Sequence, residues 1–323
     1  MLLFFAALIF GLISLIFSSD KFIEHSALIA KKLNVSPLII GFTLVALGTS
    51  APEMVVSAIA AFENAPELAV GNVLGSNIAN IALVFGATLL ISNMPVKAGL
   101  ATKEIPILLG ITMLAGLLLY DNTLDMIDGI ILIMAFFISL FLLLRNSKNL
   151  EDKLTQEIPE EENRSISLSI YIALIGLTIL ILSSKLLVWG ATGIATQLGI
   201  SELLIGLTIV AIGTSLPELA ASITSTLKGH HDIAIGNILG SNLFNLATVL
   251  PLPAIIAPGL IDKQIMAHDY WWMFYTTLFL TLCIILFRKT RSASIPKWIG
   301  VLLLISYMTY LFSLYGQAQQ VIA

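Results

Sequence analysis

The segment GFTLVALGTSAPE at residues 41–53 returns as GLTIVAIGTSLPE at residues 206–218, and this pair of segments decides the fold. The repeat continues beyond them, because GNVLGSNIAN at residues 71–80 returns as GNILGSNLFN at residues 236–245. Both pairs keep the same offset of 165 residues without a gap. A repeat that holds its register over this distance indicates two halves built on the same plan.

The composition of the chain is that of an integral membrane protein. Of its 323 residues, 58% are hydrophobic and only 11% are charged, and the mean hydropathy is +0.98. A soluble domain carries about 25% charged residues. The net charge of -4 is small and the basic residues are scattered over several loops, which excludes a nucleic-acid-binding surface. The single cysteine, Cys283, excludes an intrachain disulfide and a metal site built from cysteines.

The apolar segments predict about ten transmembrane helices. A hydrocarbon core about 30 Å thick is crossed by about 20 helical residues. By this measure we expect spans at residues 2–30, 37–62, 67–92, 103–120, 124–144, 167–197, 202–227, 232–257, 270–287 and 296–316. The predicted fold class is therefore an all-α membrane protein.

The offset between the repeats covers five predicted helices, and an odd number inserts the second repeat upside down relative to the first. We expect a first inverted repeat at residues 1–144, a polar linker at residues 145–166 and a second inverted repeat at residues 167–323. Inverted repeats that meet at the middle of the bilayer are a recurrent architecture of secondary transporters.

Lysine and arginine predict the orientation of the chain, because they gather in alternate loops. The basic set comprises Lys31, Lys32, Lys97, Lys103, Arg145, Lys148, Lys153, Arg164, Lys228, Arg288, Lys289, Arg291 and Lys297. The positive-inside rule places this set in the cytoplasm. We therefore expect a multi-pass protein of the cell (inner) membrane, with both termini outside and the central linker cytoplasmic.

Glu53 and Glu218 are the leading candidates for function. An acid at bilayer depth costs about 2.5–3.5 kcal/mol, so an intramembrane carboxylate is a functional hypothesis by default. In each repeat a proline precedes the glutamate, and a proline inside a helix frees backbone carbonyls one turn earlier. The carbonyls expected to be free lie at residues 46–49 and 211–214. The alternative is a pair of protonated acids that only hydrogen-bond between helices.

The residue types around the glutamates favour Na⁺ or Ca²⁺ as the bound ion. Carboxylates, hydroxyls and backbone carbonyls are hard oxygen ligands of the kind that Ca²⁺ prefers. Neither repeated motif contains Cys or His, which disfavours a soft transition metal. Ser76 and Asn80 are four residues apart, as are Ser241 and Asn245, so each pair shares one helical face and can point at the carboxylates. Hydrogen bonding between helices is the alternative role of these four side chains.

The sequences GTSAPE and GTSLPE, each followed by GN-x-x-GSN, resemble the two alpha-repeats of the sodium/calcium exchangers. These proteins belong to the calcium/cation antiporter superfamily, and the resemblance is to its compact bacterial members. It covers essentially the whole chain. It implies a cluster of cation sites near the membrane midplane that Na⁺ and Ca²⁺ occupy in competition, and a switch of access by sliding of the first and sixth helices.

The resemblance also implies a set of ion ligands. Glu53 and Glu218 are the central ligands, assisted at the Ca²⁺ site by Thr49 and Thr214. Flanking Na⁺ sites are implied at Ala46, Ser50, Ser76, Ala211, Ser215 and Ser241, with Asn80 at the middle position. Asn245 stands where several relatives, including the potassium-dependent exchangers, carry aspartate, and this puts potassium dependence in doubt.

The expected function is secondary active antiport of Na⁺ against Ca²⁺, with Na⁺, Ca²⁺ and the lipid bilayer as the only partners. No cofactor, enzymatic activity or obligatory protein partner is expected. Two glutamates neutralise one Ca²⁺ but leave one positive charge with three Na⁺, the ratio that the resemblance implies, so exchange is expected to be electrogenic. The alternatives are a Ca²⁺/H⁺ antiporter of the same superfamily, whose members usually carry a glutamate in the helix that contains GN, and a Ca²⁺ channel.

Overall fold

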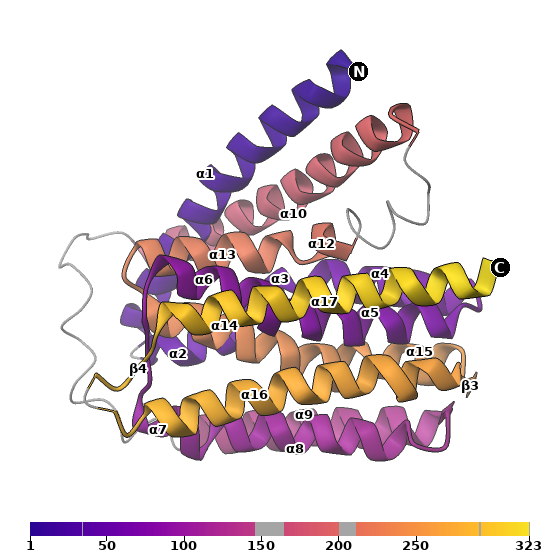
Figure 1. Ribbon diagram of the computed structural model, residues 1–323. Helices are drawn as coiled ribbons and strands as arrows, with labels where there is room; N and C mark the ends of the chain where they lie inside the picture. The colour runs from indigo at the N-terminus through magenta and orange to yellow at the C-terminus, as the bar shows by residue number, and fades with distance from the viewer. Residues whose placement is uncertain (34, 146–164, 200–210, 291, 323) are drawn as a thin grey trace.

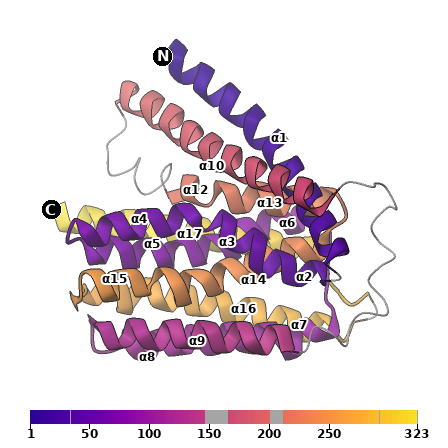
Figure 2. The same ribbon diagram turned by 180° about the vertical axis from the view of Figure 1, so that it is seen from behind.

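The helices form one bundle, from which two long helices lean away. The computed structural model describes residues 1–33, 35–145, 165–199, 211–290 and 292–322. In both views α1 (Leu2–Lys32) and α10 (Ile166–Gln197) lie side by side and tilt away from the other helices (Figures 1 and 2). The first described helix of each repeat is thus packed on its counterpart from the other repeat.

The remaining helices of the first half include both short segments joined by breaks and longer continuous helices. They are α2 (Pro37–Ile40), the π-helical turn η1 (Gly41–Val45), α3 (Ala46–Thr49), α4 (Ala51–Phe62), α5 (Pro66–Ala79), the π-helical turn η2 (Asn80–Phe85), α6 (Gly86–Ile91), α7 (Ala98–Thr102), α8 (Glu104–Leu118) and α9 (Met126–Arg145). Turns of π-helix are rare and often mark functional sites. Two of them occur here in the repeated motifs.

The second half repeats this order where it is described. Its elements are α12 (Ala211–Thr214), α13 (Leu216–Leu227), α14 (His231–Phe244), the π-helical turn η5 (Asn245–Val249), α15 (Pro251–Ile256), the π-helical turn η6 (Ile265–Tyr270), α16 (Trp271–Phe287) and α17 (Lys297–Ile322). The turns η2 and η5 begin at Asn80 and Asn245, which are matched across the repeats. The same local sequence therefore gives the same local break in both halves.

The expected all-α membrane fold is confirmed. In the described part of the chain, eight helices are long and apolar enough to cross a membrane, and the pair Pro37–Thr49 and Ala51–Phe62, bent by 43°, makes a ninth. The one remaining expected span, the seventh at residues 202–227, lies partly outside the described residues, as does most of the expected linker at residues 145–166. The division of the chain at that linker stays a prediction.

Two short antiparallel pairs of strands reflect the inverted arrangement. The strand β1 (Met94–Pro95) pairs with β4 (Ser294–Ile295), and β2 (Thr123–Leu124) pairs with β3 (Gly259–Leu260). β1 and β3 occupy matching places in the two repeats, at the offset of 165 residues. Figure 1 shows β4 and β3 at opposite ends of the bundle. Equivalent strand pairs at opposite ends are what an upside-down second repeat produces.

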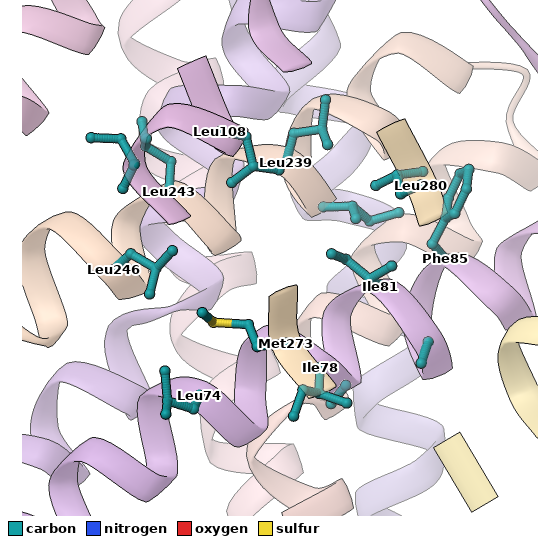
Figure 3. Packing of buried hydrophobic residues seen from close by; sticks show 14 of the residues in the cluster. Leu74, Ile78, Ile81, Phe85, Leu108, Leu239, Leu243, Leu246, Met273 and Leu280 are labelled. Carbon is teal, nitrogen blue, oxygen red and sulfur yellow. The ribbon is translucent and has the colours of Figure 1, made fainter. Parts of the chain in front are cut away.

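The apolar core lies where the GN-containing helices of both repeats meet α8 and α16. It includes Leu74, Ile78, Ile81, Phe85, Leu108, Leu239, Leu243, Leu246, Met273 and Leu280 (Figure 3). Helices in a bilayer associate mainly through close van der Waals packing, for which small residues are favourable. A Cβ at Gly236 would meet the Leu38 carbonyl, and one at Gly240 would meet the Phe42 carbonyl. These glycines let α14 approach α2 and η1 closely.

Candidate cation site

Each glutamate sits in the first turn of a helix that begins at a break. Helix α3 ends at Thr49 and α4 begins at Ala51, with Ser50 between them at φ −81° and ψ 3°. The second repeat has the same break at Ser215, with φ −89° and ψ 5°. Because proline at the second helical position needs no N–H partner, it starts each new helix without loss. The carboxylates follow at once and face the positive end of the helix dipole.

The structure brings the two glutamates together inside the protein. Glu53 is 1% exposed and Glu218 is fully buried. The Ser50 hydroxyl of the first repeat donates to Oε1 of Glu218 across 3.3 Å. Ser50 lies three residues before Glu53 on the chain, so its contact with Glu218 brings the two glutamate-bearing breaks next to each other. The break of the first repeat thus contacts the glutamate of the second inside the protein.

Among the described residues, no lysine, arginine or histidine balances the charge of these carboxylates. None of the ion pairs formed within the described ranges involves either glutamate. The Oε2 atoms of Glu53 and Glu218 also have no hydrogen-bond partner among the residues described. Buried charges in proteins are normally paired or coordinate a metal. Two carboxylates left in this condition can bind a mobile cation.

The breaks are held by two matched asparagines that sequence reasoning did not assign to the site. Asn72 donates its Nδ2 to the Glu53 carbonyl (3.4 Å) and to Ser57 Oγ (3.0 Å). Asn237 does the same to the Glu218 carbonyl (3.4 Å) and to Ser222 Oγ (2.9 Å). The signal for them was the Asn in both copies of GN-x-x-GSN. Their geometry indicates a positioning role, since they fix the backbone that carries each carboxylate.

Thr49 links the two repeats directly. Its hydroxyl donates to Oδ1 of Asn237 across 3.1 Å, and it also lies 3.4 Å from the Ala46 carbonyl. Its counterpart Thr214 ends α12. This hydrogen bond joins the break of the first repeat to Asn237, which positions Glu218 in the second repeat.

The carbonyls near the breaks differ from the sequence-based expectation. The Ala46 carbonyl is not free, because it accepts the Ser50 backbone N–H at 2.9 Å. In the second repeat, the carbonyl that Pro217 leaves without a partner is that of Gly213, four residues earlier, and it accepts the hydroxyl of Ser184 on α10 at 2.9 Å. The Ala211 side chain lies outside the described side chains. These carbonyls are partly satisfied by the protein itself.

The serines and asparagines of the second motif are buried next to the opposite repeat. Ser76, Asn80, Ser241 and Asn245 are each at most 4% exposed. Turn η2, which begins at Asn80, packs against α13, and turn η5 packs against α4. Each asparagine turn therefore lies against the helix that carries the other repeat's glutamate. The amide atoms of both asparagines, with Oγ of Ser215 and Ser241, have no hydrogen-bond partner in the described part of the chain.

The donor set suits a hard cation. It consists of two carboxylates, hydroxyls and side-chain amide oxygens, which are ligands for Ca²⁺ and Na⁺. Within the described ranges, no group of three or more His, Cys, Asp or Glu side chains that could hold a metal ion is found, so the other oxygen ligands of this site would come from hydroxyls, amides and carbonyls. Unpartnered oxygen atoms from both repeats, together with two buried carboxylates, can bind a divalent ion or monovalent ones in exchange.

Comparison with known proteins places this arrangement in a transporter family. The sequence matches the family described as "Sodium/calcium exchanger protein" over residues 3–145 and 168–316. It is 38% identical to the inner membrane protein YrbG of Escherichia coli (strain K12) over 98% of both chains. It is 29% identical to the sodium/calcium exchanger MaX1 of Methanosarcina acetivorans, over 96% of this chain and 98% of that protein.

A solved structure shares the fold. The sodium-calcium exchanger NCX_Mj matches with a TM-score of 0.83 and 32% sequence identity, covering 97% of this chain and 99% of that chain. The match extends over both repeats.

Proposed function

The chain belongs to the sodium/calcium exchanger family of cation antiporters, and we propose that it exchanges Na⁺ for Ca²⁺ across a cell membrane by alternating access. The observation that carries the proposal is the pair of buried carboxylates, Glu53 and Glu218, without a cationic partner among the described residues. One comes from each inverted repeat. A site shared between the repeats can open to either side of the membrane.

The ligand roles that we propose are those implied by the resemblance to the sodium/calcium exchangers. Glu53 and Glu218 bind the Ca²⁺ ion between them, and Thr49 and Thr214 stand one turn before them on the chain. Hydroxyls and carbonyls of the flanking residues hold Na⁺ when the Ca²⁺ has left. These flanking residues are Ala46, Ser50 and Ser76 in the first repeat, Ala211, Ser215 and Ser241 in the second, with the amides of Asn80 and Asn245 between them.

At the ratio of three Na⁺ to one Ca²⁺ that the resemblance implies, the proposed exchange is electrogenic. Two ionised glutamates are neutralised by one Ca²⁺, whereas three Na⁺ leave one positive charge. Moving one charge through 100 mV changes the free energy by about 2.3 kcal/mol. A negative interior then favours inward movement of Na⁺ and extrusion of Ca²⁺.

The orientation that we propose follows from the basic loops. Both termini lie outside, and the linker at residues 145–166 is cytoplasmic, because Lys and Arg gather in that set of loops. The same rule places the α13–α14 loop with Lys228 in the cytoplasm and the α4–α5 loop with Glu63 outside. The protein is expected in the inner membrane of its cell.

Ion flux into liposomes tests the proposal. Purified protein is reconstituted into vesicles loaded with Na⁺ and diluted into labelled Ca²⁺ without Na⁺. We expect Ca²⁺ uptake that depends on the Na⁺ gradient and increases when a valinomycin-imposed potential makes the interior positive. Uptake driven by a pH gradient in the absence of Na⁺ would instead identify a Ca²⁺/H⁺ antiporter, and uptake without any counter-ion would identify a channel.

A further inference from the structure

Lys185 is a charged residue for which the cation site gives no role. It lies in α10 (Ile166–Gln197), a helix with the length and hydropathy of a membrane span, and its side chain is exposed. No ion pair formed within the described ranges includes it. A lysine within a membrane span is a functional hypothesis by default, and the hypothesis requires a partner.

The repeat identifies that partner. The residue that matches Lys185 in the first repeat is Asp20 on α1, at the offset of 165 residues. Asp20 is paired, because Lys228 Nζ lies 2.8 Å from its Oδ1. The residue that matches Lys228 is Glu63, at the end of α4. Both members of the Asp20–Lys228 pair thus reappear in the other repeat with opposite charge, as Lys185 and Glu63.

The equivalent pair is not formed in this structure. Glu63 is exposed and takes part in none of the ion pairs made by the described residues. Lys228, by contrast, lies near two carboxylates of α1, because its Nζ is also 3.6 Å from Glu24 Oε2. One of two equivalent contacts is made and the other is open.

Only one of the two equivalent ion pairs is formed because of the position of α1 and α10. These two helices contact each other through residues that are matched across the repeats. Gly11 of α1 faces Leu187 of α10, and Gly176 of α10 faces Phe22 of α1. Leu187 and Phe22 are themselves matched across the repeats. The two helices, which lie side by side in Figure 2, therefore pack on each other through equivalent contacts from the two repeats.

The same pair docks on the rest of the protein in an asymmetric manner. Ser19 of α1 donates to the Ala220 carbonyl at 2.9 Å and to Thr224 Oγ1 at 2.6 Å, both on α13. Its counterpart Ser184 instead donates to the Gly213 carbonyl at 2.9 Å. Helix α1 therefore lies along α13, whereas α10 lies at the break that precedes α13. Exchanging the conformations of the two repeats would place α10 along α4 and Ser19 at the Gly48 carbonyl.

We propose that Lys185 and Glu63 form an ion pair in the opposite access state, in alternation with Asp20 and Lys228. When the α1–α10 pair shifts, the bond between Asp20 and Lys228 opens at one side of the membrane and the bond between Lys185 and Glu63 closes at the other. We call these two ion pairs the latch pairs: each holds one access state, and the acidic and basic positions are exchanged between them. This inference rests on the alternating access of the proposed function.

Cysteine cross-linking tests the latches without any measurement of transport. In a Cys283→Ser background, one variant carries Glu63→Cys with Lys185→Cys, and a second carries Asp20→Cys with Lys228→Cys. The matched control carries Glu63→Cys with Leu186→Cys, because the next residue on a helix points about 100° away. Each protein is oxidised in liposomes that contain Na⁺, Ca²⁺ or neither.

We expect both latch pairs to cross-link and to respond in opposite directions to the ions, so that the condition that raises one yield lowers the other. The control pair should give a low yield throughout. If Glu63→Cys with Lys185→Cys cross-links no better than the control in every condition, while Asp20→Cys with Lys228→Cys does cross-link, the proposal is wrong. The cross-linking yield does not depend on ion flux. If the expected cross-links form in a protein that does not exchange Na⁺ for Ca²⁺, the proposed ion pairs stand and only the proposed function is wrong.

Charge substitution supplies the second test. Lys185→Gln removes the latch charge and should shift the yield of the Asp20→Cys and Lys228→Cys cross-link upward by as much as about fivefold, as expected for loss of one exposed ion pair. Lys185→Glu should shift it further, and adding Glu63→Lys should restore the original yield. If Lys185 only reaches to lipid headgroups, Glu63→Lys will not restore the yield, and that result would overturn the proposal.

Discussion

Replacement of Glu218 by glutamine is the most informative change to the cation site. The amide keeps the shape of the carboxylate and can still accept the Ser50 hydroxyl, which lies 3.3 Å from Glu218 Oε1. It removes one of the two negative charges buried in the site. The effect of this substitution is therefore an effect of charge and little else.

Its magnitude follows from the burial of the group. Removing one partner of a buried ionic interaction costs about 3–5 kcal/mol, and each 1.4 kcal/mol is a factor of ten in affinity. We expect the affinity for Ca²⁺ to fall by about two to three and a half orders of magnitude. Electrostatic energy scales with the product of the charges, so the affinity for each Na⁺ should fall by about half as many orders.

The assay is Ca²⁺ uptake into Na⁺-loaded liposomes over a range of external Ca²⁺ concentrations. Glu218→Gln and Glu53→Gln should each abolish uptake at concentrations that saturate the unmodified protein. Glu67→Gln is the matched control, because Glu67 is exposed at the start of α5, and its uptake should be unchanged. If Glu218→Gln transports Ca²⁺ to within twofold of the unmodified protein, the assignment of the central ligand is refuted.

Three further predictions concern the frame of the site and its energetics. Asn237→Ala should lower stability by about 1–3 kcal/mol, and more than Asn72→Ala does, because Asn237 also accepts the Thr49 hydroxyl; thermal unfolding in detergent compares the two. Gly236→Ala should lower the free energy of unfolding by about 1–3 kcal/mol, because the added methyl group would overpack against the backbone of α2 and η1. Gly71→Ala is the control: its methyl group would meet no described atom within 4 Å, so its stability in the same assay should stay within about 0.5 kcal/mol of the unmodified protein. Finally, clamping the membrane potential at zero should slow Na⁺-driven Ca²⁺ uptake relative to an inside-positive potential; equal rates would exclude a net charge movement.

The parts of the fold that the sequence predicted are those that depend on local chemistry. The proline three residues after Thr49 or Thr214 ends one helix and begins another, so the breaks and the burial of Glu53 and Glu218 could be inferred from the residues alone. Hydropathy likewise located the described spans. These features need no knowledge of what lies across the bundle.

The parts that could not be predicted depend on partners distant in the chain. Nothing near Gly213 indicates that its carbonyl is satisfied by Ser184 of another helix. The asymmetry between Ser50, which reaches Glu218, and Ser215, whose Oγ has no partner among the described residues, is also invisible in two nearly identical motifs. In one access state the two repeats have different conformations, so matched residues such as Ser50 and Ser215 make different contacts although their sequences are nearly identical.

The central claim is that one ion is held by carboxylates from both repeats, and a structure determined with Ca²⁺ present and Na⁺ absent tests it most directly. We predict density for Ca²⁺ at about 2.3–2.6 Å from oxygen atoms of both Glu53 and Glu218, and its loss when Na⁺ replaces Ca²⁺. Density that contacts only one of the two glutamates, or that persists unchanged in Na⁺, would contradict the shared site.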